Sequence, residues 1–203
     1  MKTLTNYISE KLIINQQVDE KLVINKNYNV DDSYFIYKIK ERKQIKVFND
    51  DWGNLNSYRD KIYINGEHIK LHKKWGCTEN NFDPGEYYVE IKDIDKINNC
   101  FSMFKYCDDL FNVPLFNTSN VESMYTMFYG CDNIEKVPKF DTSKVKNMKY
   151  MFYHCKNLKN VPLFDTNKVE DMEDMFRGTN NLSSETEKQW SQIYDFSLHN
   201  KKI

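Results

Sequence analysis

A segment of 24 residues occurs four times in succession in the second half of the chain. Residues 116–139 read FNTSNVESMYTMFYGCDNIEKVPK and residues 140–163 read FDTSKVKNMKYMFYHCKNLKNVPL, so the two align without a gap. The same register extends backwards over residues 92–115 and forwards over residues 164–187. A fixed period in the twenties is typical of proteins in which each repeat packs only on its neighbours. The chain is therefore predicted to form a stack of four repeats.

Apolar residues in each repeat recur at the spacing of a helix. In the second repeat Val121, Met124, Met127 and Phe128 fall at i, i+3, i+6 and i+7, and Ser119 stands where an N-cap would be. The methionines share this apolar face and are therefore predicted to be core residues. Each repeat thus predicts one amphipathic helix.

A second pattern follows this segment, in the order Leu110-x-x-Val113-Pro114, and it returns in the next two repeats. It has the apolar spacing of a leucine-rich-repeat strand. Because proline cannot donate to a ladder, the strand should be two or three residues long, or the ladder must skip that amide. The predicted fold class is an α/β solenoid of four short leucine-rich-repeat turns, each a short parallel strand plus a helix. A small β-rich unit would precede it and a C-terminal capping helix from Ser184 would close it.

The chain before the repeats divides into two predicted parts. Helical spacing of apolar residues near the start predicts an N-terminal amphipathic helix and arm over residues 1–32. From residue 33 the pattern changes to alternating aromatic and β-branched residues, and Asn65-Gly66 is typical of a type I′ hairpin turn. We therefore assign residues 33–84 to a small β-rich domain with a hairpin. Residues 85–203 would form the repeat solenoid with its caps.

Composition excludes several classes of function. The net charge of -1, with lysines and acids mixed along the chain, argues against a nucleic-acid partner. No segment approaches the ~20 apolar residues of a membrane span. Residues 1–15 lack the apolar core of a secretory signal, so we expect a cytoplasmic or virion-associated protein. Five cysteines cannot all pair, and they are expected to be reduced thiols.

No residue pattern indicates catalysis or metal binding. Cys107, Cys131 and Cys155 occupy one column of the repeat and are predicted to be small buried residues. His68 and His72 are too far apart along one strand to share an ion, since four residues of strand span ~13 Å. We therefore expect no enzyme activity, no cofactor and no metal.

The repeated block DTS-x-V-x-x-M-x-x-MF-x-x-C-x-x-L resembles the BspA-like leucine-rich-repeat family over residues 92–182. This resemblance implies a solenoid of short parallel strands and helices that binds other macromolecules, often at a bacterial or protist surface. It implies no catalytic residue. At the other end of the chain, MKTLTNYISEKLIIN resembles the N-terminal peptides of some tailed-phage proteins that are packaged into the head.

Recognition would fall on the outward side of the predicted strands. Rigid prolines flanked by polar side chains would form a flat, preorganised surface that suits a protein partner or a glycan. We therefore predict a non-enzymatic interaction module. The alternative is a structural or packaged tailed-phage virion protein with an N-terminal targeting peptide. The sequence predicts no oligomeric state. The predicted binding residues are Asn112, Pro114, Lys136, Pro138, Lys139, Asn160 and Pro162.

Overall fold

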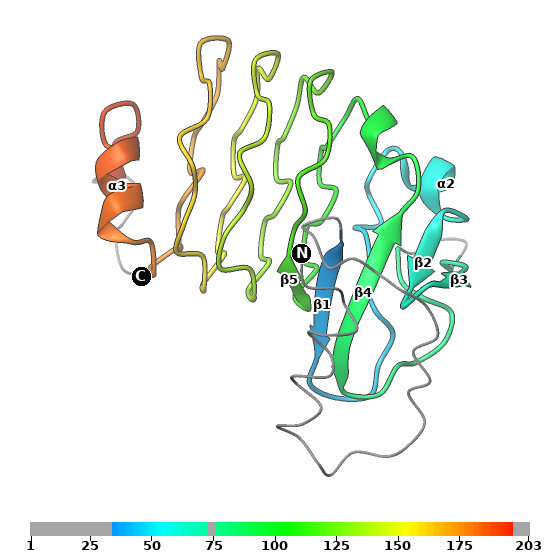
Figure 1. Ribbon diagram of the computed structural model, residues 1–203. Helices are drawn as coiled ribbons and strands as arrows, with labels where there is room; N and C mark the ends of the chain where they lie inside the picture. The colour runs from blue at the N-terminus through cyan, green and yellow to red at the C-terminus, as the bar shows by residue number, and fades with distance from the viewer. Residues whose placement is uncertain (1–33, 73–75, 197–203) are drawn as a thin grey trace, which may run out of the picture.

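The computed structural model describes residues 34–72 and 76–196. The helix and arm predicted over residues 1–32, and with them the predicted targeting peptide, lie outside this part of the chain. Within it, no helix is long and apolar enough to cross a membrane. Figure 1 shows a sheet beside a series of loops that run side by side towards the C-terminal helix.

The five named strands form one antiparallel sheet in the order β3-β2-β4-β1-β5. The strands are β1 (Phe35–Ile39), β2 (Ile62–Ile64), β3 (Glu67–Ile69), β4 (Gly85–Ile91) and β5 (Leu110–Asn112). The first three come from the predicted β-rich domain, whereas β4 and β5 come from the segment assigned to the repeats. The sheet therefore joins residues on both sides of the predicted boundary at residue 85.

The hairpin predicted at Asn65-Gly66 is present between β2 and β3, where Ile62 pairs with Ile69. Asn65 and Gly66 have φ values of 51° and 83°, as a turn with two left-handed residues requires. The helical elements are short: α2 (Leu55–Tyr58), the 3₁₀ turn η1 (Ile94–Lys96) and α3 (Ser184–Trp190). Ser183 caps α3 by accepting from the amide of Thr186, so the predicted C-terminal helix is confirmed.

The segment predicted to be a helix in each repeat is a chain of β-turns. Val121, Met124, Met127 and Phe128 are buried, as their spacing predicted. However, the hydrogen bonds run from residue i to residue i−3, as in Met127 N to Met124 O at 3.1 Å. Thr126 (φ 53°) adopts the left-handed conformation that a right-handed helix excludes. The spacing at i and i+3 therefore predicted the buried residues correctly, but the helical backbone that it predicted is wrong.

The amides of this segment alternate between two directions. In the second repeat the amides of Met127, Tyr129 and Cys131 close the β-turns, whereas the even-numbered amides from Met124 to Gly130 donate to the next repeat. A helix would use all of these amides within itself, whereas here half of them join neighbouring repeats. In the second repeat, carbonyls of the third repeat accept at 2.8–3.0 Å from the amides of Met124, Thr126, Phe128 and Gly130. The amides at the same four positions of the first and third repeats donate to the second and fourth repeats, respectively.

The predicted ladder of parallel strands is also absent from the described repeats. The only bridges between them are isolated parallel pairs such as Lys136–Asn160 and Asn147–Asp171, and the one strand that a repeat contributes, β5, pairs antiparallel with β1. The predicted α/β solenoid of leucine-rich repeats is therefore wrong. The proline in each of three repeats removes one donor, and the β-turns carry most of the backbone bonds between repeats. We call residues 92–187 the repeat stack.

A column of buried phenylalanines forms the centre of the repeat stack. The rings of Phe104, Phe128, Phe152 and Phe176 lie with centroids 5.6–5.7 Å apart and near-parallel planes. We call this column the phenylalanine ladder. One ring comes from each repeat, so a repeat alone would leave both faces of its ring exposed to water. The core is thus completed only by neighbouring repeats.

Candidate interaction surfaces

The structure separates the seven predicted binding residues into covered and accessible positions. Asn112 lies in β5, half-buried, and its amide donates to the carbonyl of Tyr34 at 3.4 Å. Pro114 is buried. These two residues therefore lie where the sheet meets the first repeat.

The remaining predicted residues lie on the second and third repeats. Lys136 and Asn160 are both exposed and are joined by a parallel bridge. The Asn160 side-chain oxygen accepts from the hydroxyl of Ser183 at 3.1 Å, so this side chain is held in place. Pro138 and Pro162 are half-buried, and Lys139 is exposed. The structure thus brings together Lys136, Pro138, Lys139, Asn160 and Pro162.

Two exposed leucines extend this surface. Leu115 and Leu163 are 61% and 41% exposed, and with Lys139 they occupy one column of the repeat. Each leucine follows directly after the proline that ends a predicted strand, and nothing in that pattern indicates exposure. We call the two leucines together with Lys136, Pro138, Lys139, Asn160 and Pro162 the proline strip.

A second surface consists of aromatic rings on the β-turns. Tyr129 stacks on Tyr153 at 4.7 Å between centroids, and Tyr106 meets Tyr129 edge-on at 5.2 Å. Phe101 stacks on Tyr125 at 5.3 Å. Contacts of Tyr150 with Tyr125 and Tyr153 connect these groups into one surface. We call it the aromatic face, formed by Phe101, Tyr106, Tyr125, Tyr129, Tyr150 and Tyr153.

The rings of the aromatic face are partly open to solvent. Tyr106 is 49% exposed and Phe101 is 37% exposed, and the other four are half-buried. Burial, and then a hydrogen bond with Tyr106, raises the pKa of Tyr129 to about 12. The Tyr129 hydroxyl therefore stays protonated at neutral pH and can donate as well as accept.

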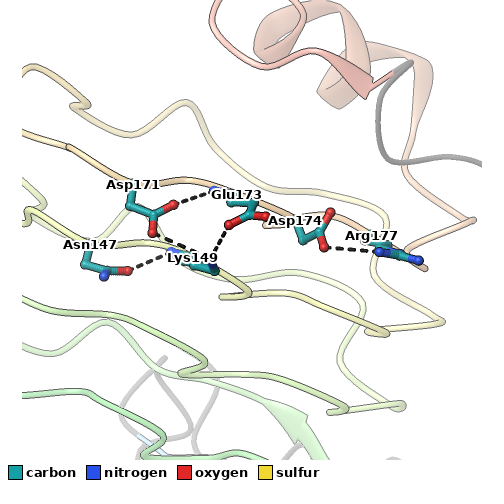
Figure 2. Close-up of polar contacts among 6 residues, drawn as sticks. All are labelled: Asn147, Lys149, Asp171, Glu173, Asp174 and Arg177. Carbon is teal, nitrogen blue, oxygen red and sulfur yellow. Dashed lines mark hydrogen bonds and ion pairs between the residues drawn. The ribbon is translucent and has the colours of Figure 1, made fainter.

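Charged groups of the third and fourth repeats lie beside Tyr150 of the aromatic face, and Figure 2 shows their contacts with one another. The Lys149 ammonium lies 5.1 Å from the centre of the Tyr150 ring and pairs with Glu173 and, at 4.0 Å, with Asp171. These carboxylates raise the pKa of Lys149. Arg177 pairs with Asp174 at 3.2 Å. Cations and carboxylates thus offset one another here.

The backbone of the aromatic face is strained at Tyr106. This residue has φ 60° and His154, in the same column, has φ 57°, whereas the second and fourth repeats carry Gly130 and Gly178 at this position. A Cβ on Gly130 would lie 2.7 Å from the Tyr106 ring, so the ring packs directly on the glycine. Residues with a Cβ disfavour this conformation. Backbone geometry alone would therefore favour glycine over tyrosine at position 106.

The cysteine column offers no reactive group. Cys107, Cys131 and Cys155 are fully buried, and burial raises their pKa values. The thiols of Cys131 and Cys155 donate to the carbonyls of Phe104 and Phe128, each at 2.9 Å. In the part of the chain that the structure describes, no three acid, histidine or cysteine side chains are placed to hold a metal ion.

Sequence reasoning missed the aromatic face because it followed the buried columns of the repeat. The signal was present in MYTMFYGC and MKYMFYHC, where aromatic residues flank the buried Met-Phe pair. A repeat position that carries aromatic residues but lies outside the spacing of the buried apolar residues is a candidate for an exposed ring. The proline strip and the aromatic face are thus the two candidate interaction surfaces.

Residues 80–192 match a protein family described as "Mycoplasma protein of unknown function, DUF285". The matching family is not the BspA-like leucine-rich-repeat family that the repeated block resembled, so that expectation from the sequence is wrong. Neither a curated protein nor a solved structure gives a significant match to the chain.

Proposed function

Because the chain belongs to the DUF285 family, whose function is unknown, we propose its role from its surface: it is a non-catalytic module that docks a protein partner on the proline strip. The observation that carries this proposal is the exposure of Leu115 and Leu163, the two exposed aliphatic side chains on the described residues of the stack. Exposed apolar side chains rimmed by polar ones are typical of protein interaction sites.

The energetics of the proline strip favour docking. Covering an exposed leucine stabilises a complex by up to ~1.5–3 kcal/mol, in proportion to the area buried. Pro138 and Pro162 fix their own backbone angles, and Asn160 is already held by Ser183. The proline strip therefore loses little conformational freedom when a partner binds. Lys136 and Lys139 add cations that suit carboxylates on the partner.

The test uses a substitution that the repeat stack already contains. The double variant Leu115→Lys/Leu163→Lys places at two positions the residue that Lys139 provides in the second repeat. A photo-crosslinking residue at Lys139 first identifies the partner, and calorimetry then measures its affinity. The double variant is expected to weaken binding at least tenfold, about 1.4 kcal/mol, with an unchanged melting temperature. The charge variant Lys136→Glu/Asn160→Glu should act in the same direction.

The control is Lys168→Glu, which changes an exposed charge outside the proline strip. It should bind like the wild-type protein. Equal affinity of the wild type, the leucine variant and the charge variant for the crosslinked partner would rule out the proline strip as its docking site.

A further inference from the structure

We propose that the aromatic face binds a neutral polysaccharide, which makes it a second site with a different ligand class from the proline strip. Three observations carry this inference: partly exposed rings that recur along the stack, charges that offset one another, and a strained residue kept at Tyr106.

The rings supply the apolar part of such a site. Each sugar ring has a face of C–H groups, and positively polarised hydrogens are attracted to the electron-rich face of an aromatic ring. Tyr106 and Phe101 offer the most open rings, and Tyr125 and Tyr129 continue the surface into the second repeat. A polymer of repeating units can therefore contact successive rings along the stack and gain affinity from several weak contacts.

The polar groups of the aromatic face suit hydroxyls rather than phosphates or sulfates. Lys149 and Arg177 are already paired with three carboxylates, Asp171, Glu173 and Asp174, as Figure 2 shows. Lys105, which lies 5.2 Å from the centre of the Tyr129 ring, is the one cation of this surface without a carboxylate partner among residues 34–72 and 76–196. Three cations against three acids leave no net field to attract a polyanion.

The same groups supply fixed donors and acceptors. Carboxylate oxygens accept, ammonium and guanidinium groups donate, and tyrosine hydroxyls do both. The side chains of Asn147 and Asp171 are held in place because their oxygens accept from the backbone amides of Lys149 and Glu173 at 2.9 Å. Preorganised polar groups beside aromatic rings are the usual composition of a site for a small polar ring.

The conformation of Tyr106 supports a role in binding. The repeat stack accepts glycine in this column at Gly130 and Gly178, without the strain that a side chain brings at φ 60°. Tyr106 nevertheless keeps a large ring that is half exposed. The Tyr106 ring enlarges the aromatic face, whereas the Tyr106 backbone would adopt its conformation more easily with glycine at this position.

The experiment is affinity electrophoresis of the full chain in gels that contain dextran, hydroxyethylcellulose, galactomannan or xylan, with heparin and poly(dT) gels as charged probes. At least one neutral polysaccharide is expected to retard the wild-type protein. Tyr106→Gly should weaken this retardation about tenfold with an unchanged or higher melting temperature. Phe101→Glu, which places in the first repeat the residue found at Glu173, should weaken it as well.

The matched control is Leu115→Lys/Leu163→Lys on the proline strip, which should be retarded like the wild type. This variant also separates the two proposals. If it loses protein docking but still binds the polysaccharide, the two ligands bind at different surfaces. Retardation by heparin or poly(dT) alone, or by none of the polymers, would overturn the inference. So would equal retardation of the wild type, Tyr106→Gly and Phe101→Glu.

Discussion

On its β-turn side the stack ends in a row of backbone carbonyls at the first repeat and in a row of amides at the fourth repeat. The reason is that the bonds between β-turns run in one direction, from an amide of one repeat to a carbonyl of the next, as in Phe104 N to Met127 O at 2.9 Å. Away from the β-turns, bonds in the reverse direction also occur, as in Lys146 N to Glu122 O at 2.9 Å. The β-turns at the two ends therefore need different partners: donors at the first repeat and acceptors at the fourth.

The carbonyl end is covered by the segment before α2. The backbone amide of Asn49 donates to the carbonyl of Met103 at 2.8 Å, and the Asn49 side-chain amide donates to the backbone carbonyl of Lys105 at 3.0 Å. The indole N–H of Trp52 donates to the carbonyl of Asn99 at 3.1 Å. This segment thus takes the place of a preceding repeat.

The amide end is covered mainly by rings. Trp190 contacts Phe176, the last ring of the phenylalanine ladder, with centroids 5.2 Å apart. The amide of Phe176 donates to the hydroxyl of Tyr194 at 3.4 Å. Asparagine and tryptophan supply N–H donors for carbonyls, whereas the amide end recruits a tyrosine as its acceptor. The direction of the hydrogen bonds between β-turns thus matches the groups that cover the β-turns at each end, N–H donors at the first repeat and a hydroxyl acceptor at the fourth.

The largest effect is expected from Trp190→Ala at the amide end. Trp190 is fully buried, contacts Phe164 as well as Phe176, and donates to the carbonyl of Val161 at 3.2 Å. Truncating a buried tryptophan to alanine costs ~3–5 kcal/mol. Urea unfolding should therefore show a loss of this size in the free energy of unfolding.

The control for Trp190→Ala is Gln189→Ala in the same helix, α3. Gln189 is half-buried and bonds only to Glu185 at the surface, at 2.8 Å. Its removal should change the free energy of unfolding by no more than ~0.5 kcal/mol. Similar losses for the two variants would mean that helix content, and not the cover over Phe176, stabilises this end.

An intermediate effect is expected from Asn49→Ala at the carbonyl end. Asn49 is buried, and the change leaves the Lys105 carbonyl without its donor, which costs ~1–3 kcal/mol. Asn54→Ala is the matched control. The Asn54 amide donates to the Asn99 carbonyl at 3.4 Å, but that carbonyl also accepts from Trp52.

Because the Asn99 carbonyl keeps a partner, Asn54→Ala should cost less than Asn49→Ala in the same urea experiment. Hydrogen exchange can follow the amide of Phe104 in the first repeat, which should lose protection in Asn49→Ala. If Asn54→Ala proved the more harmful change, the donor at Lys105 would not be what holds this end.

The sequence predicted which residues are buried better than it predicted their backbone. Val145, Met148, Met151 and Phe152 are fully buried, as their spacing indicated. A helix and a chain of β-turns both place residues i and i+3 on one side, so the spacing could not distinguish them. The left-handed conformation of Tyr150, φ 57°, falls on a residue type that gives no sequence signal for it.

The candidate surfaces were only partly visible in the sequence. The proline strip was predicted from its columns, but the coverage of Asn112 by β1 depends on pairing between residues far apart in the chain. The exposure of Leu163 could not be read from its residue type. The aromatic face depends on packing between repeats, such as Tyr129 on Tyr153, which periodicity alone did not reveal.

The smallest effect is expected from Tyr194→Phe, which keeps the ring at the amide end and removes the acceptor of the Phe176 amide. The loss should be ~0.5–1.5 kcal/mol at pH 8. Burial raises the pKa of Tyr194 from 10.0 to about 12, so the unfolded chain ionises first as the pH rises. The stability that the neutral hydroxyl contributes is therefore complete below pH 10 and is lost as the pH approaches 12. The wild type should lose this contribution and the variant should not, so the difference between them should shrink at pH 11. A difference in unfolding free energy that stays constant from pH 8 to pH 11 would show that Tyr194 does not close the amide end through its protonated hydroxyl.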